Sequence, residues 1–302
     1  MEEKDITEAA AAPAAEAPKK ERKPIRHMMW AAALISLLLM LLGEILGDLF
    51  TGFLARLFHV QDGGVLFLFM YLSFLGIDLV VLLYTGLFEK PVFRTFGYRA
   101  AGGEGNTWKL FGIGLLVGFG MNAGCILLAW LHGDLHFSLG AFRPFYLLAA
   151  LVCVCIQSGA EELLCRRYMM GVLRDRYNVW VAAAFNALFF GALHLFNNGV
   201  TVLGILNVVA VGFALSVAMI KLRSLWFCIA VHTAWNYSQS IFFGLPNSGI
   251  VSAGSFLHLE AAADSIFYDT GFGVESSFPA LAMMVLLTVC LLLIGRRKSA
   301  ES

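Results

Sequence analysis

Three short segments of this chain place polar and ionisable side chains inside long apolar runs. The first extends from Glu161 to Arg166, the second ends at His194, and the third contains His232 and Asn236. Charge is costly at membrane depth, so an ionisable residue there indicates a functional site by default. A carboxylate, two imidazoles and an amide can supply a base that activates water and donors for an oxyanion. These residue types therefore suit hydrolysis.

The composition predicts the elements that must position these side chains. Of the 302 residues, 59% are hydrophobic and only 14% are charged, and apolar runs of membrane-spanning length recur along the chain. We therefore predict an all-α, polytopic transmembrane helical bundle. Eight spans are expected, at residues 29–50, 64–87, 110–130, 144–165, 179–197, 201–220, 225–245 and 278–295.

The basic residues predict the orientation of these spans. With a cytoplasmic N-terminus, all of the 21 lysines and arginines except Arg56 and Arg143 fall in inner segments, as the positive-inside rule requires. The expected outer loop 246–277 carries acids but neither lysine nor arginine. We expect a multi-pass protein of the cell membrane with both termini in the cytoplasm.

Two regions are expected along the chain. Residues 1–27 are polar, charged and rich in alanine and proline, which predicts a disordered cytoplasmic tail rather than a signal peptide. Residues 28–298 form the predicted transmembrane domain, and no small-residue cleavage site follows its first apolar run, so we expect the first span to be retained. The six cysteines lack metal-ribbon or disulfide spacing and are interpreted as small buried hydrophobes.

Helical spacing separates the roles of the two adjacent glutamates. Glu162 and Arg166 are four residues apart with the acid first, the favourable order for an ion pair, whereas Glu161 points about 100° away around the helix. Glu162 and Arg166 can be a purely structural ion pair. Glu161 stays available as a general base that takes a proton from water.

The histidines can reach the same depth as Glu161. If the fourth and fifth spans form a hairpin that turns near Tyr177, Glu161 and His194 each lie about 25 Å along their helices from the turn. His232 and Asn236 share one face of the seventh span and reach a similar level. Either histidine alone can equally be a packing residue. A long fourth helix would also draw Arg166 inward, which snorkelling, a kink or the pair with Glu162 can resolve.

Other ionisable residues are not assigned chemistry. Glu44 and Asp48 share a face of the first span, and Asp78 lies in the second. They can line a cavity mouth, but we favour interfacial solvation or a structural partner. The remaining histidines fall in tails, loops or span edges: His27, His59, His132, His136 and His258.

The ordered set of motifs resembles one known family. Glu161-Glu162-x-x-x-Arg166, Phe190-x-x-x-His194 and His232-x-x-x-Asn236 are similar to the CPBP family, the CAAX-protease and bacteriocin-processing intramembrane proteases. Each motif is weak alone, but three in order on three spans are specific. The resemblance covers about residues 150–245. One departure is Arg167, where many bacterial members carry glycine.

The resemblance implies a catalytic role for each motif residue. Glu161 and His194 would activate a water, His232 and Asn236 would stabilise the oxyanion, and Glu162 with Arg166 would support them. The family has been described both as metal-independent and as metal-dependent. Glu161, His194 and His232 would be the ligands if zinc binds, but there is no HExxH spacing, so we favour a glutamate mechanism without a metal.

We therefore expect an intramembrane endopeptidase that acts on a membrane-associated protein or a peptide precursor. The expected partners are membrane lipid and that substrate, with no nucleic acid. Two alternatives stay open: a non-catalytic membrane scaffold of the same fold, and a proton-coupled transporter in which Glu161 and the histidines form a relay. The chain has no visible internal repeat, which is unlike most secondary transporters.

Overall fold

A computed structural model of the chain describes residues 23–94 and 105–294. The predicted tail lies largely outside the described residues. Its last part, Ile25–His27, forms the short 3₁₀ helix η1, and the side chain of His27 is buried against the bundle. This segment packs as part of the transmembrane domain.

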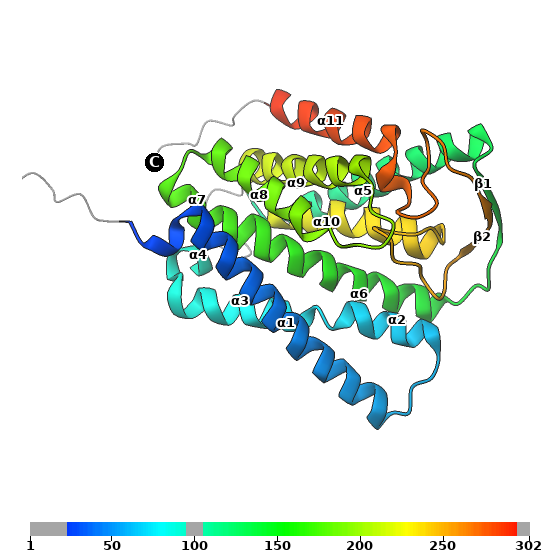
Figure 1. The fold of residues 1–302 in the computed structure, drawn as a ribbon, viewed down its shortest axis with the longest axis horizontal. Coiled ribbons are helices and arrows are strands. Elements are labelled where there is room, and N and C mark those ends of the chain that lie inside the picture. Colours follow the sequence, from blue (N-terminus) through cyan, green and yellow to red (C-terminus); the bar gives the residue numbers. More distant parts are fainter. Residues whose placement is uncertain (1–22, 95–104, 295–302) are drawn as a thin grey trace, which may run out of the picture.

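The architecture is an all-α helical bundle, as predicted (Figure 1). Between η1 and residue 294 the elements are α1 (Met29–Leu57), α2 (Gly63–Leu72), α3 (Leu75–Phe88), α4 (Lys90–Arg94), α5 (Trp108–His132), β1 (Leu135–Leu139), α6 (Pro144–Glu162), the π-helical segment η3 (Leu163–Met169), α7 (Met170–Arg176), α8 (Val179–Leu193), α9 (Val202–Leu222), α10 (Leu225–Tyr237), the π-helical segment η4 (Ser238–Phe242), β2 (Leu257–Ala262), η5 (Val274–Ser276) and α11 (Phe278–Leu293).

Five helical stretches in the described part are long and apolar enough to cross a membrane. They are Met29–Leu57, Gly63–Phe88, Trp108–His132, Pro144–Arg176 and Val202–Leu222. The other three expected spans are occupied by α8, α11 and the continuous pair α10 and η4, which are shorter. Large apolar side chains remain exposed along α1, α3 and α5, as expected for surfaces that face lipid rather than water.

Glycines let neighbouring helices approach closely where the bundle is tightest. A Cβ on Gly118 of α5 would lie 2.2 Å from the carbonyl oxygen of Val231 on α10, and one on Gly76 of α3 would lie 2.1 Å from the carbonyl oxygen of Gly43 on α1. Backbone contact through small residues is the usual way membrane helices associate. Through such contact α10 packs along α5, and because it also packs against α6 it takes a central position.

The segment between α10 and α11 is not a simple outer loop. Its strand β2 pairs antiparallel with β1, with Leu135 opposite Ala262 and Leu139 opposite Leu257. Apolar sequence periodicity did not predict either strand. The two strands lie at the opposite end of the bundle from α4 and α7 (Figure 1).

Candidate active site

The motif residues predicted from the sequence lie around one region of the bundle interior. Glu161 and Glu162 end α6, Arg166 lies in η3, His194 caps the C-terminus of α8, and His232 and Asn236 lie on α10. A cavity of about 250 Å³ is lined by Glu161, His194, His232 and Asn236, whereas Glu162 and Arg166 are not among its lining residues. The predicted hairpin is present, because α7 ends at Arg176 and α8 begins at Val179.

Glu162 is the buried centre of a charged network. Its side chain is inaccessible to solvent, and its Oε1 lies 3.1 Å from Nη1 of Arg166 and 2.9 Å from Nδ1 of His232. The guanidinium of Arg166 also stacks on Phe190, with Cζ 4.2 Å from the ring centroid. The predicted ion pair between Glu162 and Arg166 therefore forms, and it supplies a counter-charge for Arg166 inside the bundle. One buried carboxylate thus binds a guanidinium on η3 and an imidazole on α10.

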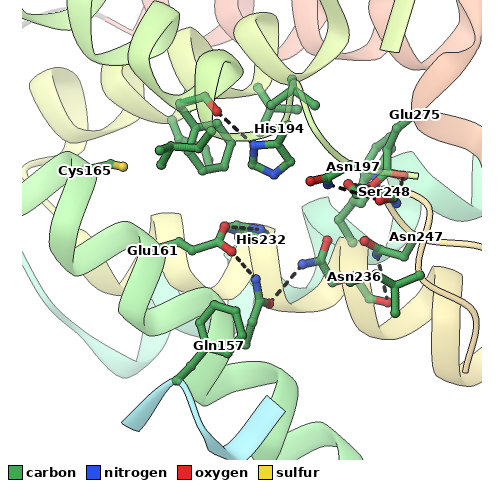
Figure 2. A pocket seen from close by; sticks show the side chains of 18 of the residues that line it. Gln157, Glu161, Cys165, His194, Asn197, His232, Asn236, Asn247, Ser248 and Glu275 are labelled. Atoms are coloured by element: carbon green, nitrogen blue, oxygen red, sulfur yellow. Dashed lines mark hydrogen bonds and ion pairs between the residues drawn. The ribbon is translucent and has the colours of Figure 1, made fainter. Parts of the chain in front are cut away.

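The carboxylate of Glu161 faces the cavity. One of its oxygens accepts a hydrogen bond, and the other is directed toward His232. Its Oε1 accepts a hydrogen bond of 2.6 Å from Nε2 of Gln157, one turn earlier on α6. Its Oε2 lies 3.7 Å from Nε2 of His232 and has no hydrogen-bond partner among the described residues. Figure 2 shows Glu161, Gln157 and His232 around the same space. Oε2 can therefore accept a proton from a water in the cavity.

The two histidines are oriented by different partners. Nδ1 of His194 lies 2.9 Å from the carbonyl oxygen of Phe190, so Nδ1 carries a hydrogen and Nε2 is left as an acceptor when the ring is neutral. Nδ1 of His232 lies beside the Glu162 carboxylate, so this nitrogen also carries a hydrogen. The ring of Phe190 packs against both, 4.9 Å from His194 and 6.1 Å from His232 between centroids.

Gln157 is a site residue that the sequence analysis missed. Its Oε1 accepts a hydrogen bond of 3.2 Å from Nδ2 of Asn236, while its Nε2 donates to Glu161. One side chain thus joins the predicted base to the predicted oxyanion donor (Figure 2). Its position four residues before Glu161, on the same helix face, is the signal that could have identified it.

The segment after α10 forms another wall of the cavity. Asn247, Ser248 and Glu275 line it, and Oε2 of Glu275 accepts hydrogen bonds from the backbone N–H of Ser248 at 2.7 Å and from Nε2 of Gln239 at 2.9 Å. Burial raises the pKa of Glu275 to about 7, although these hydrogen bonds oppose the shift. From the sequence, Glu275 is recognisable only as an acid of the expected outer loop 246–277.

The acidic residues of the first two spans differ in whether they line the cavity. Glu44 lines the same cavity as Glu161, whereas Asp48 and Asp78 are not among the lining residues. Glu44 therefore lies at the cavity, whereas interfacial solvation or a structural partner was the interpretation favoured from the sequence.

The described residues do not offer a ready-made metal site. No group of three or more histidine, cysteine, aspartate or glutamate side chains in residues 23–94 and 105–294 is arranged to hold a metal ion. Glu161, His194 and His232 line one cavity without meeting as a ligand set. These donors therefore do not fit zinc as placed, and we route no chemical step through a metal.

The fold and the cavity define a polytopic helical membrane protein with acid, histidine and amide side chains gathered in its interior. Within this class, residues 142–238 match the family model described as Type II CAAX prenyl endopeptidase Rce1-like. This segment is an Rce1-like domain of the CPBP family, which confirms the resemblance and indicates a CAAX-type intramembrane endopeptidase in general terms. The matched segment begins just before α6 and extends through α10, so it contains every motif residue. No curated protein and no solved structure shows a significant match to the chain.

Proposed function

We propose that the chain hydrolyses a peptide bond in a membrane-associated protein or peptide, with Glu161 as the general base. The observation that supports this most directly is that Oε2 of Glu161 is buried, without a hydrogen-bond partner among the described residues, and directed into a cavity that His194, His232 and Asn236 also line. A carboxylate in this position can accept one proton from water while its other oxygen is fixed by Gln157.

His194 orients the attacking water. With its Nδ1 hydrogen donated to the carbonyl of Phe190, the neutral ring presents Nε2 as an acceptor for a water hydrogen. Glu161 takes the other hydrogen as a proton, and the water oxygen forms a bond to the carbonyl carbon. This leaves a tetrahedral intermediate with a negatively charged oxygen.

His232 and Asn236 stabilise that oxygen. Nδ1 of His232 is held by Glu162, so when the ring is protonated Nε2 also carries a hydrogen and can donate it to the oxyanion. Nδ2 of Asn236 donates one hydrogen to Gln157 and retains a second for the oxyanion. The proton held by Glu161 then passes to the amide nitrogen, the C–N bond breaks, and the products are a carboxylic acid and an amine.

The test uses the purified full chain in proteoliposomes with two quenched fluorescent peptides, one farnesylated at a CAAX cysteine and one unmodified and apolar. We expect cleavage of at least one peptide. Glu161→Gln keeps the size of the side chain but is a far weaker base, so turnover should fall at least 100-fold while the unfolding temperature changes little. Asp48→Asn removes an exposed carboxylate that does not line the cavity and is the matched control.

The outcomes separate the proposed roles. Undiminished turnover in Glu161→Gln would overturn the assignment of the base. His232→Ala and Asn236→Ala should lower kcat by about 100-fold or more with a smaller change in KM, because an oxyanion donor acts in the transition state. Transport of protons without cleavage of either peptide would instead favour a transporter, and neither activity would favour a scaffold.

A further inference from the structure

The cavity that contains the proposed base also has a second group of polar side chains in its wall. Figure 2 shows Asn197, Ser248 and Glu275 together on one side of the cavity. Asn207, on α9, lines the same cavity. Neither the proposed reaction nor the family match assigns these four residues a role.

Hydrogen bonds connect the four residues to one another. Nδ2 of Asn197 donates to the carbonyl oxygen of Ser248 at 3.1 Å. The backbone N–H and the hydroxyl group of Ser248 donate to Oε2 and Oε1 of Glu275, at 2.7 and 3.2 Å. Nδ2 of Asn207 donates to the carbonyl oxygens of Glu275 and Ser277, at 2.6 and 2.9 Å. The four residues therefore form one end of the cavity wall.

These hydrogen bonds leave this end of the cavity rich in acceptors. Because Nδ2 of each asparagine is bound to a backbone carbonyl group, each amide has its oxygen Oδ1 available to accept. Asn207 is only 2% exposed, and its Oδ1 has no hydrogen-bond partner among the described residues. A buried acceptor without a donor is unfavourable, and a ligand that carries N–H groups would satisfy it.

The charges in the cavity wall favour a cation as that ligand. The described lining contains the carboxylates of Glu44, Glu161 and Glu275 but neither lysine nor arginine. Its basic side chains are those of His194 and His232. Charges are screened less in a buried cavity than in water, so this excess of acids attracts a cationic group and repels an anionic one.

We propose that this end of the cavity binds the ammonium group of a peptide substrate, either a lysine side chain or a free N-terminus. The inference rests on the proposed function, since it treats the cavity as the place where the peptide binds. An ammonium group has three N–H donors, and Oδ1 of Asn197, Oδ1 of Asn207 and Oε1 of Glu275 can accept them. The carboxylate of Glu275 supplies the counter-charge. Ca²⁺ takes about six to eight oxygen ligands, so these acceptors suit an ammonium group better than that ion.

The test measures peptide binding to the full chain in phosphatidylcholine nanodiscs by isothermal titration calorimetry. The chain carries Glu161→Gln, so that bound peptide is not cleaved, and empty nanodiscs give the background. The probes are an apolar pentapeptide with a central lysine and both ends capped, its counterpart with norleucine in place of lysine, and the norleucine peptide with a free N-terminus. An ammonium-bearing peptide that binds at least about tenfold more tightly than the capped norleucine peptide supports the site and identifies the source of the ammonium group.

Substitution of Glu275 tests whether the preference arises at this end of the cavity. Glu275→Gln keeps the size of the side chain but removes the counter-charge, so the preference should fall from about tenfold to within about twofold, with little change for the capped norleucine peptide. Glu44→Gln is the matched control, because it removes a carboxylate of the same cavity that lies on α1, and it should leave a preference above about fivefold. An equal loss in this control would show general attraction by the acids of the cavity and overturn the site. If Glu275→Gln does not fold, Asn197→Ala removes a half-buried acceptor in its place and should reduce the preference at least about threefold.

The outcomes also separate this inference from the proposed function. Equal affinities for the three peptides would overturn the ammonium site and leave the assignment of Glu161 as the base untouched. Binding of none of them would overturn both, because the cavity would then not take up a peptide. An ammonium preference in this assay, combined with no cleavage of any peptide by the wild-type chain, would support the site and overturn the proposed reaction alone.

Discussion

Replacing Glu162 by glutamine tests whether the buried charged network holds the site together. Glu162 is fully buried, lies 3.1 Å from Arg166 and 2.9 Å from Nδ1 of His232, and connects η3 to α10. Glutamine keeps the shape and can still accept a hydrogen bond from His232. It removes the negative charge, however, and leaves the buried guanidinium of Arg166 without its counter-ion.

The expected cost follows from that unpaired charge. Removing one partner of a buried ion pair typically costs about 3–5 kcal/mol, and the stacking of Arg166 on Phe190 is present before and after the change, so it does not reduce this cost. Removing both charges with Glu162→Gln and Arg166→Met together should recover most of the loss. The coupling energy between the two positions should therefore be at least about 2 kcal/mol.

The assay is equilibrium unfolding of the purified chain in mixed micelles, with helix content measured by circular dichroism. Asp48→Asn, an exposed carboxylate on α1, is the control and should change the free energy of unfolding by less than about 0.5 kcal/mol. If Glu162→Gln costs less than about 1 kcal/mol, or if the double variant is no more stable than the single one, the ion pair is not what stabilises this part of the bundle.

Two further predictions concern side chains that the sequence analysis did not place at the site. Gln157→Leu removes the hydrogen bonds to both Glu161 and Asn236, so kcat should fall about tenfold or more with little change in KM, and an unchanged kcat would exclude a positioning role. Because the folded chain favours protonated Glu275, its stability should fall by roughly 3 kcal/mol as pH rises from about 4.5 through about 7. Glu275→Gln should remove this dependence and the exposed Glu260→Gln should not, as unfolding temperatures between pH 4 and 8 would show.

Much of the bundle could be predicted because each membrane helix corresponds to a long apolar run in the local sequence. The apolar runs located all eight helical regions, and the position of Tyr177 located the hairpin that brings Glu161 and His194 to one cavity. An α-helix rises by a fixed distance per residue, so the number of residues from a turn gives the depth of a side chain in the bundle. Residues on different helices could therefore be compared by depth. His232 could be predicted near them in the same way, from its distance along the seventh span and without side-chain contacts.

The parts that could not be predicted depend on contacts between distant segments. The π-helical segments η3 and η4 interrupt their helices without a proline or a distinctive local pattern. Glu275 enters the cavity because Gln239 and Ser248 bind it, and those residues lie 36 and 27 positions away. Periodicity describes one helix at a time, so it does not encode how a long connecting segment folds back over the bundle.

Residues of η3 line both the candidate active-site cavity and a second cavity of about 990 Å³. Arg166 lies four residues after Glu162 and is paired with it, and Arg166 and Arg167 both line the second cavity. His232 is held by the same carboxylate oxygen of Glu162 that pairs with Arg166. The charged network that orients the proposed oxyanion donor His232 therefore extends through Arg166 to the wall of the second cavity.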